Sequence, residues 1–168
     1  MLGPSGSGKS TLAQAIGDAR GLPVVHLDQY RHLEGTQWEL RPDEKFAQLH
    51  DDAVATERWV IDGSYSKLMP QRLARATGVI LLDISTARSL ARYIPRTLTP
   101  GPRAGGLEGT RDTLSWEMVH FITMRTRPNR RMRKELFARL EIPKISLSSP
   151  AAVSDFYVRE GLTRVTIE

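Results

Sequence analysis

One stretch near the start of the chain constrains the fold more than any other. It reads Gly3-Pro4-Ser5-Gly6-Ser7-Gly8-Lys9-Ser10-Thr11 and fits the pattern G-x-x-x-x-G-K-[ST], in which a glycine-rich loop leads into a helix. The glycines allow successive backbone N–H groups to point inward at a phosphate, and the helix that begins at Lys9 adds the positive end of its dipole. The sequence therefore predicts a phosphate-binding loop.

Each part of this loop has an expected role. Lys9 is expected to reach the β- and γ-phosphates of ATP, and Ser10 to offer its hydroxyl to Mg²⁺. The predicted ATP-binding residues are Gly3, Ser5, Gly6, Ser7, Gly8, Lys9, Ser10 and Thr11. A Gly/Ser linker is the simpler alternative, but Leu12, Ala15 and Ile16 follow at helical spacing, which a linker would not show.

A buried parallel strand normally leads into such a loop, and here only Met1 and Leu2 precede Gly3. We therefore expect the first strand to be largely missing from this sequence, and the natural chain to begin several apolar residues earlier. Three buried strand side chains would contribute about 1.5 to 3 kcal/mol each, which rivals the net stability of a whole domain, roughly 5 to 15 kcal/mol.

The composition predicts one soluble domain that covers residues 1–168. A chain of 168 residues with 40% apolar residues is long and apolar enough for a single core. The absence of cysteine excludes disulfides and thiolate metal sites. We find neither an apolar run that could span a membrane nor a signal peptide, so a cytoplasmic location without membrane contact is expected.

Short apolar runs alternate with helical patterns along the chain, which predicts an α/β fold with a parallel sheet and helices on both faces. Two of these runs end in an acid, Asp28 and Asp62. Ligands of open parallel sheets bind beyond the carboxyl ends of the strands, so both acids should lie beside the loop. We expect Asp62 to hold Mg²⁺ together with Ser10, although Asp62-Gly63 could also be an ordinary turn.

Two other polar residues receive simpler roles. Asp83 follows a third apolar run and is expected to cap the next helix. His50 lies on a helix that opens at Pro42, and we expect its side chain to face solvent.

Arginine is concentrated in the second half of the chain. Residues 85–168 hold 15 Lys and Arg against eight Asp and Glu, and 11 of the 19 arginines lie between Arg88 and Arg139. The planar guanidinium suits bidentate contact with the phosphates of a nucleotide or of a nucleic-acid backbone, but a solvated basic face is the simpler explanation for any single arginine. Residues 97–112 are rich in Gly and Pro, which predicts a functional lid or a disordered loop.

These motifs resemble the nucleoside monophosphate kinases among the phosphate-loop proteins. More closely, the chain is similar to the small adenylate-kinase-related group known as DNA topology modulation proteins. The resemblance covers nearly the whole chain, and its most specific features are Trp38, the segment Asp62-Gly63-Ser64-Tyr65-Ser66, and Arg92-Tyr93-Ile94-Pro95-Arg96 ahead of the lid. It implies that ATP lies in the loop and that Arg92 and Arg96 close onto the transferring phosphoryl group.

The sequence departs from adenylate kinases at the acceptor site. Those enzymes carry an arginine that grips the acceptor's phosphate at the place where Ser66 stands here, so AMP need not be the acceptor. Arg31, Arg41 or Arg72 could replace that arginine. Alternatively, the acceptor reacts at a hydroxyl group, for which Asp28 would be a suitable general base.

The expected function is that of an ATP- and Mg²⁺-dependent kinase that acts on a small-molecule or nucleotide acceptor. Its expected catalytic residues are Lys9, Asp28, Arg92 and Arg96, and its expected metal ligands are Ser10 and Asp62. Two alternatives stay open: a nucleotide-dependent regulator that binds DNA through the arginine-rich region, and a catalytically silent ATP-binding protein. DNA binding is the less favoured, because we find no helix-turn-helix and no zinc motif.

Overall fold

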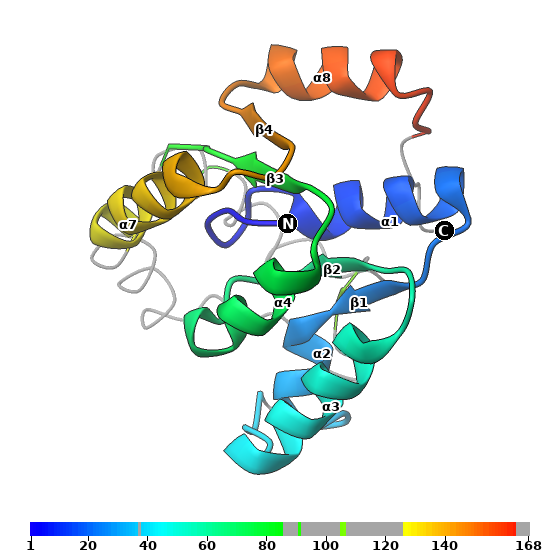
Figure 1. Ribbon diagram of the computed structural model, residues 1–168, viewed down its shortest axis with the longest axis vertical. Helices are drawn as coiled ribbons and strands as arrows, with labels where there is room; N and C mark the ends of the chain where they lie inside the picture. The colour runs from blue at the N-terminus through cyan, green and yellow to red at the C-terminus, as the bar shows by residue number, and fades with distance from the viewer. Residues whose placement is uncertain (37, 86–90, 92–104, 107–125, 164–168) are drawn as a thin grey trace.

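The computed structural model describes residues 1–36, 38–85, 91, 105–106 and 126–163, which form a mixed α/β structure with short parallel strand pairs (Figure 1). The elements in chain order are α1 (Lys9–Arg20), β1 (Val24–His26), α2 (Leu27–Arg31), α3 (Asp43–Ala55), β2 (Val60–Asp62), the 3-10 turn η1 (Ser66–Leu68), α4 (Met69–Arg75), β3 (Val79–Leu82), α7 (Thr126–Arg139), β4 (Lys144–Leu147) and α8 (Pro150–Arg159). The predicted α/β class is therefore confirmed.

The strands form two parallel pairs, β1 with β2 and β3 with β4, and the start of the chain lies between them. Leu2 donates its N–H to the carbonyl of Ile80, and its own carbonyl accepts from Leu82, which makes a parallel bridge to β3. On the other side, the Met1 amine donates to the carbonyl of Ile61 in β2. The first two residues thus link the two pairs, in the order β1, β2, Met1–Leu2, β3, β4.

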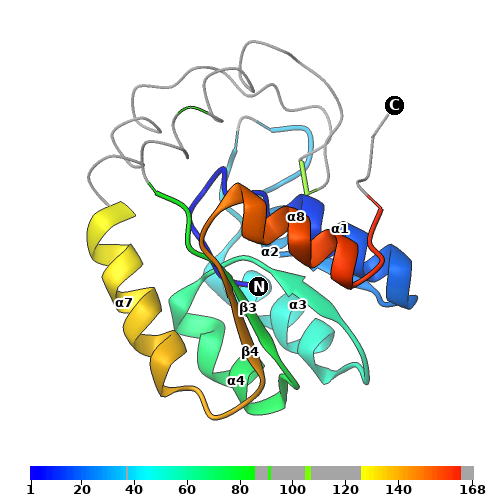
Figure 2. The ribbon, with the colours of Figure 1, turned by 90° about the horizontal axis from the view of Figure 1, so that it is seen from above.

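Helices α1 and α8 lie on one side of the strands, above them in Figure 1 and in front of them in Figure 2. Leu12 and Ala15 of α1 pack with Phe156 and Tyr157 of α8 in one buried cluster. Helix α8 is started by Ser149, whose side-chain hydroxyl accepts the N–H of Ala152, as expected for an N-cap.

Helices α3, α4 and α7 lie on the opposite side (Figure 1, Figure 2). Phe46 and Val54 of α3 pack against Val25 and Ile61 of the strands in a second buried cluster. A third cluster contains Leu2, Met69, Val79 and Leu81, with Leu136 and Phe137 of α7 packed against it. The predicted helices on both faces are present, and no helix among the described residues is long and apolar enough to cross a membrane.

Two local predictions are wrong. The apolar run that is expected to end at Asp28 is a strand only as far as His26, because Leu27–Arg31 turns into the short helix α2 and puts Asp28 in its first turn. His50 is fully buried rather than facing solvent, because it lies on the same side of α3 as Phe46, Ala53 and Val54. The predicted lid, apart from Gly105 and Gly106, and both Arg92 and Arg96 lie outside the described residues.

Candidate functional site

The glycine-rich loop leads into helix α1 through two left-handed glycines. Gly6 and Gly8 have φ angles of 70° and 91°, in the left-handed region that other residues rarely adopt. Gly8 is the N-cap residue of α1, and the helix begins at Lys9. No side chain caps this end of the helix, so its first N–H groups are open to an anion, to which the helix dipole adds an attractive field.

The predicted phosphate ligand Lys9 folds back over the loop, where its Nζ donates to the carbonyl oxygen of Pro4 at 3.0 Å. Ser5, Gly6 and Gly8 are half-buried, whereas Thr11 is exposed on the first turn of α1. Ser7 and Gly3 are buried, and a Cβ on Gly3 would lie 2.8 Å from the carbonyl oxygen of Leu82. The loop thus starts in tight contact with β3 and opens toward solvent at Lys9.

The two predicted metal ligands meet at the end of this loop. Ser10 Oγ donates to Asp62 Oδ2 at 2.6 Å, across 52 residues of sequence. The other carboxylate oxygen, Asp62 Oδ1, is buried and has no hydrogen-bond partner among the described residues. A buried carboxylate oxygen with free lone pairs next to a hydroxyl is a suitable set of donors for Mg²⁺, which prefers oxygen ligands.

These two residues alone would not enclose a cation. In the described part of the chain, no group of three or more His, Cys, Asp or Glu residues could hold a metal ion. Mg²⁺ commonly binds through one or two protein oxygens and takes its other ligands from substrate phosphates and water. The residues present therefore fit a magnesium ion that arrives with a nucleotide.

His26 is the third member of this cluster, and sequence reasoning missed it. It is the last residue of β1, stands opposite Asp62 in the parallel register, and places Nδ1 3.3 Å from Asp62 Oδ2. Its side chain is 7% exposed, and its Nε2 has no partner among the described residues. The rule that singled out Asp62, namely that strand ends share one edge of a sheet, applies equally to His26 and could have identified it.

The surroundings keep Asp62 ionised. Burial alone would raise the pKa of Asp62, but the hydrogen bonds from His26 and Ser10 and the positive charge of Lys9 outweigh it and hold the pKa below its usual value. At neutral pH Asp62 therefore carries a buried negative charge, which is what a cation site requires.

Asp28, the predicted general base, is exposed in α2 and is oriented by one neighbour. The hydroxyl of Tyr65 donates to Asp28 Oδ1 at 2.6 Å. Tyr65 has a φ of 27°, which is uncommon for a residue with a side chain, and its ring packs edge-on against Phe46. Burial, followed by the charge of Asp28, raises the pKa of Tyr65, so its hydroxyl stays protonated and donates at any physiological pH.

The three arginines considered as ligands of an acceptor phosphate are all engaged within the protein. Arg72 is buried and donates to the carbonyls of Gly63 and Ser64, each at 2.7 Å. Arg41 donates to the carbonyls of Tyr30 in α2 and of His32 just after it. Arg31 binds the carbonyl of Arg41 and the carboxylate of Asp43. They stabilise loops at the site, so the geometry does not favour them as acceptor ligands.

Two glycines of the predicted lid lie near the site, and Gly105 lies against the cluster itself. A Cβ on Gly105 would lie 2.9 Å from His26 Nδ1 and 3.0 Å from Ser10 Cβ, and its φ is +71°. Gln29 Nε2 donates to the carbonyl oxygen of Gly106 at 2.9 Å. Glycine is therefore required at position 105 for this close approach, and the segment covers Ser10 and His26.

Asp83 pairs with α7. Arg130 binds both carboxylate oxygens, with Nη2 3.0 Å from Oδ2, and Lys134 Nζ lies 2.8 Å from Oδ2. The hydrogen bond from Arg130 is the main reason why the pKa of Asp83 lies below its usual value. The helix that Asp83 is predicted to cap lies outside the described residues. These ion pairs of Asp83 thus connect the end of β3 to α7, the helix that follows the predicted lid in the sequence.

No model of a known protein family matches the chain, and no curated protein sequence matches it either. The function therefore has to be argued from the residues of the site.

Proposed function

We propose that this chain is a phosphate-loop kinase, with the fold of the nucleoside monophosphate kinases, that transfers the γ-phosphoryl group of ATP to a small acceptor. The observation that carries the proposal is the 2.6 Å contact between Ser10 and Asp62 at the end of the Gly3–Thr11 loop. A glycine-rich loop with its lysine, a hydroxyl and an ionised strand-end carboxylate are the groups that bind Mg²⁺ and nucleotide phosphates in this class of site.

Each residue of the loop then has a definite task. The left-handed glycines direct N–H groups at the phosphates, and Lys9 exchanges the neutral carbonyl of Pro4 for the more strongly attracting phosphate oxygens. Mg²⁺, held by Ser10 and Asp62 when bound, would neutralise charge on the β- and γ-phosphates. Gly105, which lies against Ser10 and His26, and Gly106, which binds Gln29, would keep water away from the reacting phosphoryl group.

The transfer itself needs little covalent chemistry from the protein. An oxygen of the acceptor forms a bond to the γ-phosphorus while the bond from that phosphorus to the β–γ bridging oxygen breaks, and ADP leaves. If the acceptor oxygen is a hydroxyl, Asp28 takes its proton, with Oδ2 available because Tyr65 binds Oδ1. Arg92 and Arg96 are proposed to stabilise the charge that develops on the phosphoryl group.

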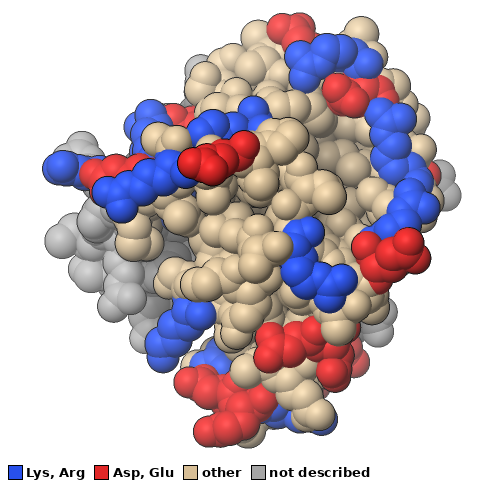
Figure 3. Space-filling model, viewed as in Figure 1, with Lys and Arg blue, Asp and Glu red and all other residues tan. Residues whose placement is uncertain are grey.

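The described basic residues do not favour DNA binding. In α7, Arg130 and Lys134 bind Asp83, Arg131 pairs with Glu135, and Arg133 is buried. On the face shown in Figure 3, Lys and Arg side chains are interspersed with Asp and Glu. Helix α7 therefore has few described Lys and Arg side chains free to bind the phosphate backbone of DNA.

The test is a pair of measurements on the full chain, on Lys9→Ala and on Lys45→Ala. Lys45 is an exposed lysine of α3 that contacts Gln48, so its replacement controls for the loss of one positive charge. Mg·ATP binding is measured by calorimetry, and phosphotransfer is then screened with radiolabelled ATP against nucleotides, nucleosides and small hydroxy acids. Loss of the charged hydrogen bonds of Lys9 should weaken binding by about 1.5 to 3 kcal/mol, or roughly 10- to 100-fold.

Transfer to one acceptor class that needs Lys9 and tolerates Lys45→Ala would support the kinase and identify its substrate. ATP binding without transfer to any acceptor would overturn the kinase in favour of a silent binder. Equal binding by the wild-type chain and Lys9→Ala would contradict the phosphate-loop proposal as a whole.

A further inference from the structure

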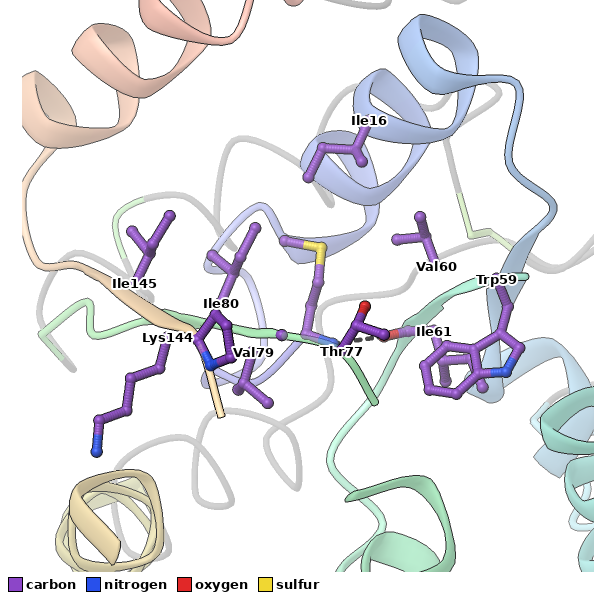
Figure 4. Close-up of a pocket in the computed structure, with 12 residues that line it drawn as sticks. Ile16, Trp59, Val60, Ile61, Thr77, Val79, Ile80, Lys144 and Ile145 are labelled. Carbon is purple, nitrogen blue, oxygen red and sulfur yellow. Dashed lines mark hydrogen bonds between the residues drawn. The ribbon is translucent and has the colours of Figure 1, made fainter. Parts of the chain in front are cut away.

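In the proposed kinase, an acceptor meets ATP at the carboxyl ends of the strands. Ser10 and Asp62 lie at that edge, because Asp62 is the last residue of β2. The cavity in Figure 4 lies at the opposite edge, where β2, β3 and β4 begin, and its lining is mostly aliphatic and contains no acid. The groups that meet an acceptor therefore belong to the segments that follow β1 and β2, which carry Asp28 and Tyr65.

The carboxylate of Asp28 is exposed beside this edge. Its Oδ1 accepts the hydroxyl of Tyr65 at 2.6 Å, which leaves Oδ2 for another donor. Tyr65 has a φ of 27°, and Arg72 holds it there by binding its carbonyl oxygen. A fixed negative charge attracts a hydroxyl group, which can donate a hydrogen bond, and repels a phosphate. Asp28 thus suits an acceptor that presents a hydroxyl.

The described arginines around Asp28 favour the same kind of acceptor. Arg31, Arg41 and Arg72 are bound to main-chain carbonyls, and Arg31 also to a carboxylate. A phosphate on the acceptor would have to displace these contacts before it could bind a guanidinium group. Lys67 of η1 is exposed, so its replacement tests for such a phosphate.

An exposed aromatic ring lies close to Asp28. Trp38 is 37% exposed and packs edge-on against His32, with the two ring centroids 5.1 Å apart. His32 Nδ1 in turn lies 2.9 Å from the carbonyl oxygen of Asp28. One imidazole ring therefore links the tryptophan to the residue that would take the acceptor's proton.

The backbone of Trp38 is strained and is held by its neighbours. Its φ is 62°, in the left-handed region that a bulky residue rarely adopts. The flanking segments pair through an antiparallel bridge between His32 and Leu40, and the N–H of Glu39 donates to Thr36 Oγ1. Strained residues that the surrounding structure holds in place cluster at ligand sites. An exposed tryptophan held in this way suits the stacking of a flat ring.

A carboxylate that can take a proton and an exposed indole close to it suit an acceptor with both a hydroxyl and a flat ring. On the basis of the proposed function, we propose that the acceptor is a nucleoside, whose base stacks on Trp38 and whose sugar hydroxyl meets Asp28. The hydroxyl gives its proton to Asp28 Oδ2 as its oxygen bonds to the γ-phosphorus, and the bond from that phosphorus to the β–γ bridging oxygen breaks. The products are a nucleoside monophosphate and ADP, and Asp28 releases the proton to water.

The experiment compares acceptors with the full chain and radiolabelled Mg·ATP. Adenosine, guanosine, cytidine and thymidine are assayed beside their 5′-monophosphates and beside glycerol, which has hydroxyl groups but no flat ring. At least one nucleoside should react, with a kcat/KM about 10-fold or more above that of its 5′-monophosphate and of glycerol. Calorimetry of Mg·ATP binding is run in parallel, because it reports on the nucleotide site independently of the acceptor.

Variants then separate the two parts of the acceptor site. Trp38→Leu should raise the KM for the nucleoside roughly 10- to 100-fold with little change in kcat, because only stacking is lost. Trp38→Phe keeps a ring and should stay closer to wild type. Asp28→Asn should lower kcat about 100-fold or more. Asp52→Asn, which replaces an exposed acid of α3, is the matched control, and circular dichroism checks that the variants are folded.

Faster transfer to a 5′-monophosphate than to its nucleoside, lost in Lys67→Ala, would overturn this inference and leave the kinase in place. The same conclusion would follow from transfer to glycerol or a small hydroxy acid but to no nucleoside, or from equal KM values of Trp38→Leu and the wild-type chain. Transfer to no acceptor at all, with Mg·ATP still bound, would overturn the proposed kinase and the nucleoside together.

Discussion

His26 contacts the candidate site through Asp62. Its Nδ1 and the hydroxyl of Ser10 share the same oxygen of Asp62, at 3.3 and 2.6 Å. Two donors on Oδ2 fix the carboxylate in one orientation and leave Oδ1 without a hydrogen-bond partner among the described residues. Residues that orient a metal ligand in this way typically change metal affinity 10- to 100-fold when they are removed.

We therefore predict that His26→Leu weakens Mn²⁺ binding to the chain and its nucleotide about 10-fold, because Asp62 loses a donor. His26→Asn should stay close to wild type, since its side-chain amide can donate from nearly the position of Nδ1. Electron paramagnetic resonance titration of free Mn²⁺ measures both, and urea unfolding checks that the variants are folded. If Asn and Leu weaken binding equally, His26 contributes packing and not a hydrogen bond.

At the scale of elements, Arg72 connects α4 to the loop that follows β2. Its guanidinium donates to the carbonyls of Gly63, Ser64 and Tyr65 at 2.7, 2.7 and 3.3 Å. Burial lowers the pKa of Arg72 to about 10, so it is charged at neutral pH, with Asp62 acting in the opposite direction to burial. Tyr65 belongs to this loop and donates its hydroxyl to Asp28. Arg72 thus positions the hydrogen-bond partner of Asp28.

Replacing Arg72 with Met should destabilise the protein by about 3 kcal/mol, because three carbonyls lose a charged donor and the buried ones stay without a partner. Arg75→Met is the matched control on the same helix, since Arg75 makes one exposed contact with the carbonyl of Thr56 at 3.4 Å. Its effect should stay within about 0.5 kcal/mol. Urea unfolding measures the free energy of unfolding of both variants. A similar decrease in the two would mean that Arg72 does not hold the loop in place.

The positions of these elements explain which parts of the site could be predicted from the sequence. The contact between Ser10 and Asp62 could be predicted from the glycine-rich motif and from the rule that parallel strands end at one edge of a sheet. Neither argument requires knowledge of the whole fold. The place of Asp28 did not follow, because the turn into α2 after His26 depends on packing around Leu27, which is fully buried. Local propensity is a weak guide where tertiary packing decides.

Contacts between distant elements were the least predictable. Asp83 and Arg130 are 47 residues apart, and no spacing in the sequence relates a strand end to a particular arginine of a helix. His50 is different, because Phe46, His50 and Val54 recur every four residues, and that periodicity indicates one buried side of α3. Giving a histidine the same weight as the apolar residues around it would have corrected that prediction.

For the molecule as a whole, the start of the chain is the link between its two strand pairs. Among the described residues, the bridge of Leu2 to β3 and the hydrogen bond of Met1 to β2 connect them through the main chain. The glycine-rich loop begins at the next residue. Any change that weakens the hydrogen bonds of Met1 and Leu2 should therefore also destabilise the candidate site. The stability of this chain of 168 residues should therefore depend on the protonation of the Met1 amine.

The pKa of the Met1 amine falls from its usual 8.0 to about 5 because of burial, with Asp62 opposing the fall and Arg72 and Lys9 adding to it. Between pH 5 and 8 the unfolded chain binds a proton that the folded chain does not, so the free energy of unfolding rises with pH over this range. The rise from pH 5 to pH 8 should be about 3 kcal/mol, and well below pH 5 the cost of the buried charge is fully present. Asp62, with its lowered pKa, contributes stability that is lost only at more acidic pH.

Adding Ser-Gly-Ser before Met1 isolates this effect, because the extension moves the amine away from Ile61 and leaves every other titratable side chain in place. Subtracting the two urea-derived stability curves cancels the histidines and carboxylates that both chains share. The stability of the chain that begins at Met1, relative to the extended one, should rise by about 3 kcal/mol from pH 5 to pH 8. A difference that stays constant over this range would show that the amine is not buried between β2 and β3, and would remove the link between the two strand pairs on which the loop depends.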